Sequence, residues 1–549
     1  MLTPAASYDE LYGSFKWRLP DRFNIARAAC DRHAEATPDN PALIYEDQAG
    51  TVRQYSFRQI RQLANRTANM LRGHGVGRGD RVAILLGQRP ETAVTHLGCF
   101  KLAAISIPVF TLFGEEALEF RFGNSGAVAV VTDRENYPKI AAIRDRCPAL
   151  RLVFLVDGGE TGTLDFHQEL ARASDRAQTI DTAADDPAFI SYTSGTTGPP
   201  KGALHAHRAL LGHMTGFEFL LNFYGFEGDL MWSPADWAWI AGLMDVLFPS
   251  WFLGKPVLAF RTAGPFDPAQ AFHMMAKHQV RSTLLVPTML KMMRQVTDPP
   301  PVNLRSMFSG GEAVGREILE WARARFGIDV NEGYGQTECN LITGHVPALM
   351  PARLGALGRP APGHVVSIVD DEGNEVAPGV EGHIACRRPD PVMLLEYWDN
   401  PQATREKYIG DWLITGDLGR KDEDGYLWFV GRADDVITSS GYRIGPGEIE
   451  DCLLKHPGVA LSAAIGKPDP ARTEIIKVFV VPAEGHIPGP ALEEDLRGFV
   501  RDKLARHEYP REIEFVTELP TTATGKVMRR VLKQREIDRQ EENHRVRGR

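Results

Sequence analysis

A regular alternation of predicted helices and strands in the first part of the chain constrains its fold most. Ser56 to Gln59 matches a capping box, and apolar residues then follow at helical spacing as far as Gly73. The alternating segments are, in chain order, 56–73, 81–86, 91–102, 105–109, a helix after Glu115, and 128–132. Strands that alternate with helices form parallel sheets with helices on both faces. The sequence therefore predicts an α/β chain with a doubly wound sheet.

The pattern of predicted secondary structure changes twice towards the C-terminus. Strand and helix patterns continue to about Gly355, and short alternating segments with turns between 367 and 385 then predict a β-rich subdomain. A second change, at 431–435, begins the pattern of a small α+β domain. We therefore expect a large N-terminal domain at 1–433, which holds the doubly wound sheets and the β-rich subdomain, and a small C-terminal domain at 434–549.

Composition narrows the possible partners. A net charge of -9 over 549 residues argues against nucleic acid, because binding its backbone needs a surplus of Lys and Arg. The N-terminus shows no signal peptide, and the most apolar stretch, 240–260, is interrupted by Asp, Lys, Pro and Gly, so we expect no membrane span. Six scattered cysteines without a CxxC pair indicate neither a zinc site nor a disulfide framework. These features favour a cytoplasmic enzyme.

The stretch from Ser191 to Lys201, SYTSGTTGPPK, has the composition of a phosphate-binding loop. Its glycines let backbone N–H groups turn towards one anion, and its hydroxyls and Lys201 add donors and charge. The spacing is not that of a Walker P-loop, because the four residues after Gly195 lead to Pro200. The alternative for this stretch alone is a flexible surface turn.

Four further stretches carry polar groups that suit a nucleotide. They are GYGQTE at 333–338, TGD at 415–417 followed by Arg432, SGYRIGPG at 440–447, and PTTATGK at 520–526. We expect the first to follow a strand at 329–331, where α/β sheets bind ligands. Each stretch alone is weak evidence for a nucleotide site, because a TGD is usually a hairpin turn and a lysine in a Gly-Thr turn is usually solvated.

Together and in this order, the five stretches resemble those of the adenylate-forming superfamily of acyl-CoA synthetases, nonribosomal adenylation domains and luciferases. SGYRIGPGEIE gives the chain most likeness to medium-chain acyl-CoA synthetases and then to acetyl-CoA synthetase. The resemblance implies that ATP activates a small carboxylic acid as acyl-AMP, with Mg²⁺, and that coenzyme A then takes the acyl group. Alternatives are an adenylation enzyme that loads a carrier protein and a non-catalytic nucleotide-binding module.

The resemblance also implies roles for individual residues. Asp417 and Arg432 would bind the ribose hydroxyls, Thr337 the α-phosphate and Glu338 the magnesium ion, while Lys526 would stabilise charge on the reacting oxygen. The residues implied for ATP binding are Thr193, Ser194, Gly195, Thr196, Thr197, Gly198, Lys201, Gly311, Glu312, Ala313, Tyr334, Asp417, Arg432 and Arg443.

A hinge and an acyl pocket follow from the same resemblance. Asp434 would be the hinge about which the C-terminal domain turns between half-reactions, and Gly441 would line the path of the CoA thiol. The alternatives are a cap at Asp434 and a surface ion pair at Arg443.

The acyl pocket is implied to lie between Trp239, Ile240 and Ala241 on one side and Gly335 on the other. Acetyl-CoA synthetases resemble GYGQTE but carry tryptophan in place of Gly335, so the glycine would leave room for acids longer than acetate. The alternative for Trp239 to Ala241 is plain core. Cys339 and Asn340 depart from the small residue pair that often follows the glutamate, which bears on acyl preference. His205 and His207 are expected to pack rather than bind metal.

Overall fold

The computed structural model describes residues 1–193, 199–260, 264, 266–433, 435, 437–439, 442–469, 473–504, 509–521 and 527–547. The chain divides into two compact units. Unit 1 comprises 1–195, 199–366 and 386–413, and unit 2 comprises 196–198, 367–385 and 414–549. The predicted domain boundary at 433/434 stays a prediction.

Unit 1 contains the predicted α/β architecture. One of its sheets has the order β19 (Glu396–Tyr397), β9 (Lys201–Ala206), β8 (Pro187–Thr193), β4 (Ile105–Pro108), β3 (Arg81–Leu85), β5 (Ala129–Thr132), β6 (Leu152–Leu155) and β7 (Leu164–Asp165). The strands from β8 to β7 pair in parallel, whereas β9 and β19 are antiparallel. This confirms the doubly wound pattern expected from the strand and helix alternation.

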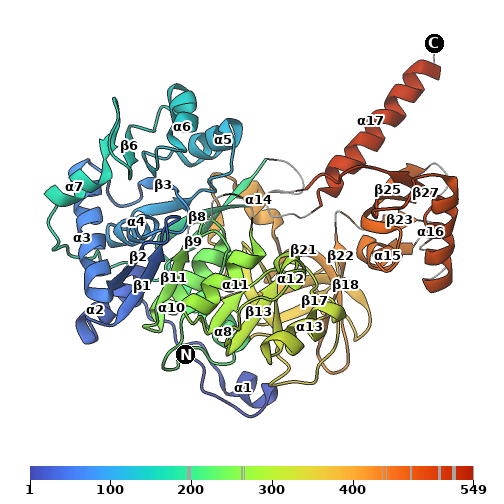
Figure 1. The fold of residues 1–549 in the computed structure, drawn as a ribbon, viewed down its shortest axis with the longest axis horizontal. Helices are drawn as coiled ribbons and strands as arrows, with labels where there is room; N and C mark the ends of the chain where they lie inside the picture. The colour runs from blue at the N-terminus through green and yellow to red at the C-terminus, as the bar shows by residue number, and fades with distance from the viewer. Residues whose placement is uncertain are drawn as a thin grey trace. The chain divides into compact units, whose positions relative to one another are not determined.

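Helices α3 (Phe57–Gly73) and α4 (Pro90–Lys101) pack against each other beside this sheet (Figure 1). The predicted capping box begins α3, because the Ser56 side chain accepts from Gln59 and the Gln59 side chain accepts from Ser56. The two helices approach closely at Gly98, where an added Cβ would lie 2.8 Å from a methyl carbon of Thr67. Local capping and close packing therefore fix this pair of helices.

The second sheet of unit 1 carries the GYGQTE segment. Its order is β16 (Ala356–Pro360), β15 (Cys339–His345), β14 (Val330–Gln336), β13 (Ser306–Gly310), β12 (Ser282–Leu284), β10 (Met231–Trp232), β11 (Val257–Phe260), β1 (Pro41–Glu46) and β2 (Val52–Ser56). The prediction of a strand only at 329–331 is too short, because β14 continues to Gln336. Antiparallel pairing with β15 provides the hydrogen bonds that extend it.

Helix α8 (Ala209–Leu220) lies against β15 and is buried on all sides. The apolar stretch at 240–260 forms the short helix α9 (Ile240–Gly242), the π-helical turn η3 (Leu243–Leu247), helix α10 (Phe248–Phe252) and strand β11. Most of its side chains are buried in unit 1. Over the described ranges, the structure contains no helix whose length and apolar character would let it cross a membrane.

Unit 2 contains two groups of strands. The β-rich segment has the order β17 (Val366–Val369), β18 (Glu381–Arg387), β21 (Trp412–Lys421) and β22 (Leu427–Arg432). The α+β part has β23 (Ile437–Ser439), β24 (Tyr442–Ile444), β25 (Val459–Asp469), β26 (Thr473–Pro482) and β27 (Glu512–Phe515). Helices α15 (Pro446–Leu453) and α16 (Pro490–Lys503) share one apolar core with these strands (Figure 1). Helix α17 (Arg529–Arg547) packs on a separate cluster through Leu532.

Candidate active site

The two ends of the predicted phosphate loop lie side by side in unit 1. Thr193 is the last residue of β8 and Lys201 the first of β9, and they are partners across the antiparallel ladder. The Thr193 hydroxyl lies 3.4 Å from the carbonyl oxygen of Lys201, to which it donates. Ser194, Gly195, Thr196, Thr197 and Gly198 lie outside the described residues. The structure therefore places the base of this loop at the end of the β8–β9 hairpin.

Thr337 and Glu338 form the turn between β14 and β15. Glu338 is buried, at 7% exposure, and its backbone carbonyl accepts from the N–H of Leu394 at 2.9 Å. The Tyr397 hydroxyl donates to Oε1 of the same glutamate. Burial and the nearby Glu338 charge raise the pKa of Tyr397, so this hydroxyl stays a donor. The tyrosine thereby orients the carboxylate of the GYGQTE motif.

The segment around Tyr397 also connects Glu338 with the phosphate-loop base. Strand β19 pairs with β9, and the N–H of Trp398 donates to the carbonyl of Gly202 at 2.7 Å. The Lys201 ammonium lies 5.3 Å from the centre of the Tyr397 ring, within range of a cation–π contact. Lys201, Tyr397 and Glu338 therefore form one cluster, which brings a cation and a carboxylate to the same place.

Other ATP-site residues predicted for unit 1 lie on neighbouring strands. Gly311, Glu312 and Ala313 follow β13 and are exposed or nearly so. Tyr334 lies on β14, which pairs with β13 in parallel, so both positions belong to the same end of the sheet. Lys407 donates to Oε1 of Gln336 at 2.8 Å and thus holds the strand end next to Thr337.

Unit 2 holds the two residues predicted for the ribose. Asp417 on β21 and Arg432 on β22 are cross-strand partners, and the guanidinium donates to Oδ1 of Asp417 at 2.9 Å. The alternative that TGD is a hairpin turn does not hold, because pairing with β22 keeps it within a strand. Arg443 lies on β24. Asp434, Gly441 and Lys526 lie outside the described residues.

The residues predicted for the acyl pocket lie on two segments of unit 1. Trp239 precedes α9, and its ring centre lies 5.2 Å from that of Phe110. Ile240 and Ala241 begin the helix and are partly exposed. Gly335 lies where the β14–β15 register shifts, and an added Cβ would lie 2.3 Å from the backbone nitrogen of Leu341. The glycine therefore has a packing reason of its own, and a larger side chain requires the hairpin to move.

A magnesium ion fits this site through Glu338. In the described part of the chain no group of three or more His, Cys, Asp or Glu side chains is arranged to hold a metal. Mg²⁺ in nucleotide sites uses one or two carboxylates together with the substrate's phosphates and water, so it needs no such group. One oriented carboxylate beside a phosphate loop meets this requirement.

His205 and His207 are fully buried, as expected for packing residues. His205 stacks on Phe189 with ring centres 4.8 Å apart, and His207 Nδ1 accepts from the N–H of Ile25. Burial lowers the pKa of both histidines to about 3, so both are neutral near pH 7.

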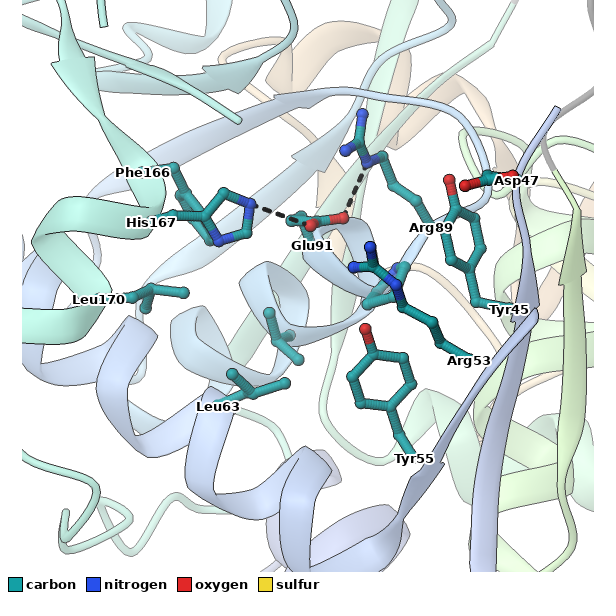
Figure 2. Close-up of a pocket in the computed structure, with 12 residues that line it drawn as sticks. Tyr45, Asp47, Arg53, Tyr55, Leu63, Arg89, Glu91, Phe166, His167 and Leu170 are labelled. Carbon is teal, nitrogen blue, oxygen red and sulfur yellow. Dashed lines mark hydrogen bonds and ion pairs between the residues drawn. The ribbon is translucent and has the colours of Figure 1, made fainter. Parts of the chain in front are cut away.

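A separate cavity of about 430 Å³ lies near the N-terminus of α4 (Figure 2). Tyr45, Tyr55 and Arg53 face it, and its polar centre is Glu91, which binds Arg89 Nε at 2.8 Å and His167 Nε2 at 3.2 Å. Although burial opposes ionisation, the bonds from these partners lower the pKa of Glu91 to about 2. None of the residues that line this cavity is among those predicted for ATP, the acid or CoA.

Sequence reasoning missed Tyr397 and Lys407, which lie outside the five motifs. Tyr397 is 59 residues from Glu338 along the chain. The available signal was the EYWDN stretch at 396–400, whose aromatic and acidic composition is common in surface turns as well. Only the pairing of β19 with β9 brings it to the site.

Comparison with known proteins places both parts of the chain in one family. The family model described as AMP-binding enzyme matches residues 30–398, and that described as AMP-binding enzyme C-terminal domain matches 448–526. Acetyl-coenzyme A synthetase of Bacillus subtilis is 36% identical, covering 97% of this chain and 95% of that protein. Human mitochondrial acyl-coenzyme A synthetase ACSM4 is 35% identical, covering 94% of this chain and 91% of that protein.

Solved structures of CoA ligases share the fold. The anthranilate CoA ligase AuaEII in complex with anthranoyl-AMP has a TM-score of 0.84 and 29% identity, over 94% of this chain and 98% of that one. An acyl-CoA synthetase of Brucella canis has a TM-score of 0.74 and 33% identity, over 98% of this chain and 100% of that one. The similarity therefore extends over nearly the whole length of both proteins.

Proposed function

The chain belongs to the AMP-binding enzyme family, and we propose that, as an AMP-forming acyl-CoA ligase, it acts on short- to medium-chain or small aryl carboxylic acids. In the first step the acid's carboxylate attacks the α-phosphorus of ATP, forming acyl-AMP and releasing pyrophosphate. In the second step the CoA thiol attacks the acyl carbon, so that a thioester forms, AMP leaves and the thiol proton is released. A carboxylate is a poor electrophile, which is why the first step must precede the second.

The observation that carries this function is the cluster of Lys201, Tyr397 and Glu338 at the base of the Ser191–Lys201 loop. The lysine supplies positive charge for the triphosphate, and the hydroxyl-bound carboxylate is the group that would hold Mg²⁺. When bound, the ion would neutralise phosphate charge. Thr337, in the same turn as Glu338, is the donor that we assign to the α-phosphate.

In unit 2, the Asp417 and Arg432 pair suits a ribose diol. The carboxylate accepts from hydroxyl groups, and Arg432 already fixes its direction through one hydrogen bond. We assign Gly311, Glu312 and Ala313 to the adenine, Lys526 to the reacting oxygen, Asp434 to the hinge and Gly441 to the thiol path on their motifs. Trp239, Ile240, Ala241 and Gly335 are assigned to the acid, with Phe110 extending the aromatic wall.

Coenzyme A, rather than a carrier protein, is the acceptor. The named relatives are coenzyme A synthetases that match over nearly their full length, and the related structures include CoA ligases. The Tyr397 bond to Glu338 and the Asp417–Arg432 pair speak against a non-catalytic nucleotide-binding module, because each holds in a fixed direction a carboxylate that we assign to the reaction.

We place the enzyme in the cytoplasm and in fatty acid or related acid metabolism. All six cysteines are free and buried, which supports a reducing compartment. Fractionation of the source cells with an antibody to the chain tests the location. Recovery of the protein in a membrane or extracellular fraction would contradict it.

The defining experiment measures pyrophosphate and AMP release with acids from acetate to dodecanoate and with benzoate, with and without CoA. We expect AMP release that requires CoA and has its maximum at about four to ten carbons or at benzoate, since each buried methylene adds about 0.8 kcal/mol until the pocket is full. Release of AMP with none of these acids would refute the proposed substrate class. CoA-independent turnover would instead indicate a different acceptor.

A further inference from the structure

A buried carboxyl group follows the predicted acyl wall by about one turn of the chain. Asp245 has 2% exposure and lies in the π-helical turn η3, which continues from α9. It follows Ala241 by four residues, which is about one helical turn, so the two side chains lie on the same side of the segment. Asp245 is therefore one turn deeper than a residue assigned to the acyl pocket.

Asn340 reaches this carboxyl group from the opposite wall. Its Nδ2 donates to Oδ1 of Asp245 at 2.8 Å and to Oδ2 at 2.7 Å. Asn340 lies on β15, two residues after Glu338, and its Cα is 2.8 Å from the position of a Cβ added at Gly335. The bonded pair therefore joins the two segments that the acyl site is built from, although the residues are 95 positions apart.

The amide leaves the bonding of Asp245 incomplete. Within the described ranges no Lys, Arg or His forms an ion pair with Asp245, and burial raises its pKa well above the usual range. A carboxylate has about four lone-pair sites, of which Asn340 uses two, and a protonated carboxyl also has a hydrogen to donate. Each oxygen of Asp245 thus has one partner and keeps the capacity for a further hydrogen bond.

A hydroxyl group can form this further hydrogen bond with Asp245 in either protonation state of the carboxyl group. It donates to an ionised carboxylate and accepts from a protonated one, whereas an alkyl tail can do neither. An ammonium group would suit only the ionised form, which burial at this site disfavours. The chemistry of the pair therefore favours a neutral hydroxyl over both a hydrocarbon and an amine.

Resting on the proposed function, we propose that Asp245 and Asn340 form the polar end of the acyl pocket, and that the enzyme selects carboxylic acids that carry a hydroxyl group at the far end. A site built to bond a substrate hydroxyl discriminates strongly against the analogue that lacks it, because its own polar groups are then left unpaired. Here we expect kcat/KM for the hydroxy acid to exceed that for the plain acid of equal length by about 10- to 100-fold.

The test compares length-matched pairs of acids in the pyrophosphate exchange reaction, which needs no CoA. The pairs are hexanoate with 6-hydroxyhexanoate, octanoate with 8-hydroxyoctanoate and benzoate with 4-hydroxybenzoate, and 6-aminohexanoate is added. We expect one hydroxy acid to exceed its partner in kcat/KM by about tenfold or more. A ratio of one or less in every pair would overturn the inference, as would the highest kcat/KM for the amino acid.

The variant carrying Asp245→Leu and Asn340→Leu should reverse the preference, so that the plain acid of the best pair becomes the better substrate. Asp245→Val, which removes both oxygens, should by itself reduce the hydroxy-to-plain ratio, and it serves if the double variant does not fold. Asn65→Leu is the control, since Asn65 and Asn340 are both 7% exposed and the Asn65 amide nitrogen donates to the backbone carbonyl of Asp175 at 2.8 Å. It should keep the wild-type ratio. An unchanged ratio in Asp245→Val would overturn the inference.

Failure of this inference differs from failure of the proposed function. If plain acids and hydroxy acids are activated with equal kcat/KM, the ligase assignment stands and only the polar end of the pocket is refuted. If no acid supports exchange, the ligase assignment falls, and this inference falls with it.

Discussion

At the scale of single residues, the Tyr397 hydroxyl is the contact that most directly adjusts the predicted metal ligand. It donates to Glu338, while the ring of the same residue faces the Lys201 ammonium. Groups that orient a metal ligand in this way commonly change metal affinity or activity by about 10- to 100-fold. Tyr397 is therefore a positioning residue, and it acts through Glu338.

We expect Tyr397→Phe to raise the magnesium concentration needed for half-maximal pyrophosphate exchange by about tenfold, because Glu338 loses its oriented hydrogen bond while the ring is kept. Magnesium titrations of exchange at saturating ATP measure this. Tyr408→Phe is the control, because burial likewise raises the pKa of Tyr408, to about 12, whereas the described hydroxyl donor to Glu338 is Tyr397. Equal magnesium requirements in the wild type and Tyr397→Phe would contradict the role.

The aromatic pair Trp239 and Phe110 makes a second residue-level prediction. The ring centre of Trp239 lies 5.2 Å from that of Phe110. Trp239→Ala replaces the indole with a methyl group and so removes one wall of the proposed acid site. We expect the optimum chain length to rise by about two or more carbons, since the vacated volume accepts further methylenes. Exchange rates across the acid panel measure this. An unchanged optimum would place the pocket elsewhere. Gly335→Trp is less informative, because its Cβ meets the Leu341 backbone.

At the scale of elements, helix α17 begins with a buried ion pair that ties it to the C-terminal core. Arg529 binds Glu450 of α15 through Nε at 3.0 Å and through a second nitrogen at 2.5 Å. Its guanidinium also lies 3.5 Å from Asp435, and Glu450 accepts from the N–H of Ala464. The Arg529 side chain is only 15% exposed, so it belongs to this ion pair and not to the solvated face of the helix.

We expect Arg529→Met to cost about 3–5 kcal/mol of stability in the C-terminal part of unit 2, since it leaves Glu450 buried without its cation. Hydrogen exchange of the full chain, in peptides from α15 and β25, measures this loss locally. Adding Glu450→Gln should restore much of it. Arg530→Met is the control, since Arg530 is exposed on the same helix. Equal protection in the two single variants would contradict the prediction.

At the scale of the whole molecule, unit 1 holds several histidines that must stay neutral. Burial lowers the pKa of His96, His205 and His207 to about 3 and that of His213 to about 4. The ordinary pKa of histidine is 6.5, so on acidification the unfolded chain binds protons that the folded chain does not bind. The contribution of these neutral histidines to the free energy of unfolding is therefore complete above pH 6.5, and it is lost as the pH falls towards 4.

We expect the urea midpoint of unit 1 to fall steeply between pH 6.5 and 5, with about 1.4 kcal/mol lost per pH unit for each such histidine. Tryptophan fluorescence during urea titrations at several pH values measures it. His96→Gln should lower the midpoint overall but reduce its pH dependence by about one proton. A midpoint that does not change over this pH interval would contradict the burial of neutral imidazoles.

The last prediction concerns which of the two reaction steps requires Lys526. From its place in PTTATGK, Lys526 is expected to serve acyl-AMP formation only. Lys526→Ala should reduce that step by about 10²–10³, because charge on the reacting oxygen is no longer stabilised, while CoA transfer from added acyl-AMP continues. Single-turnover assays of each step measure this, with exposed Lys291→Ala as the control. Equal losses in both steps would refute the division.

The sequence by itself determined the local elements and the chemistry of the motifs. The Ser56–Gln59 box begins α3, and the alternation of 81–132 produces parallel strands, because both depend on residues within one turn or strand. The five motifs likewise predicted the family, and the structure places Thr193, Lys201 and Glu338 in one region of unit 1. Each capping box, strand or motif is formed by residues that are close together along the chain.

Only the tertiary structure decided which side chains complete the site. The bond of Tyr397 to Glu338 and that of Asn340 to Asp245 join residues 59 and 95 positions apart. The extension of β14 to Gln336 depends on the partner strand β15. Such contacts form when strands pair and helices pack, which involves burial and hydrogen bonds between distant segments, and no local propensity or spacing encodes these partners.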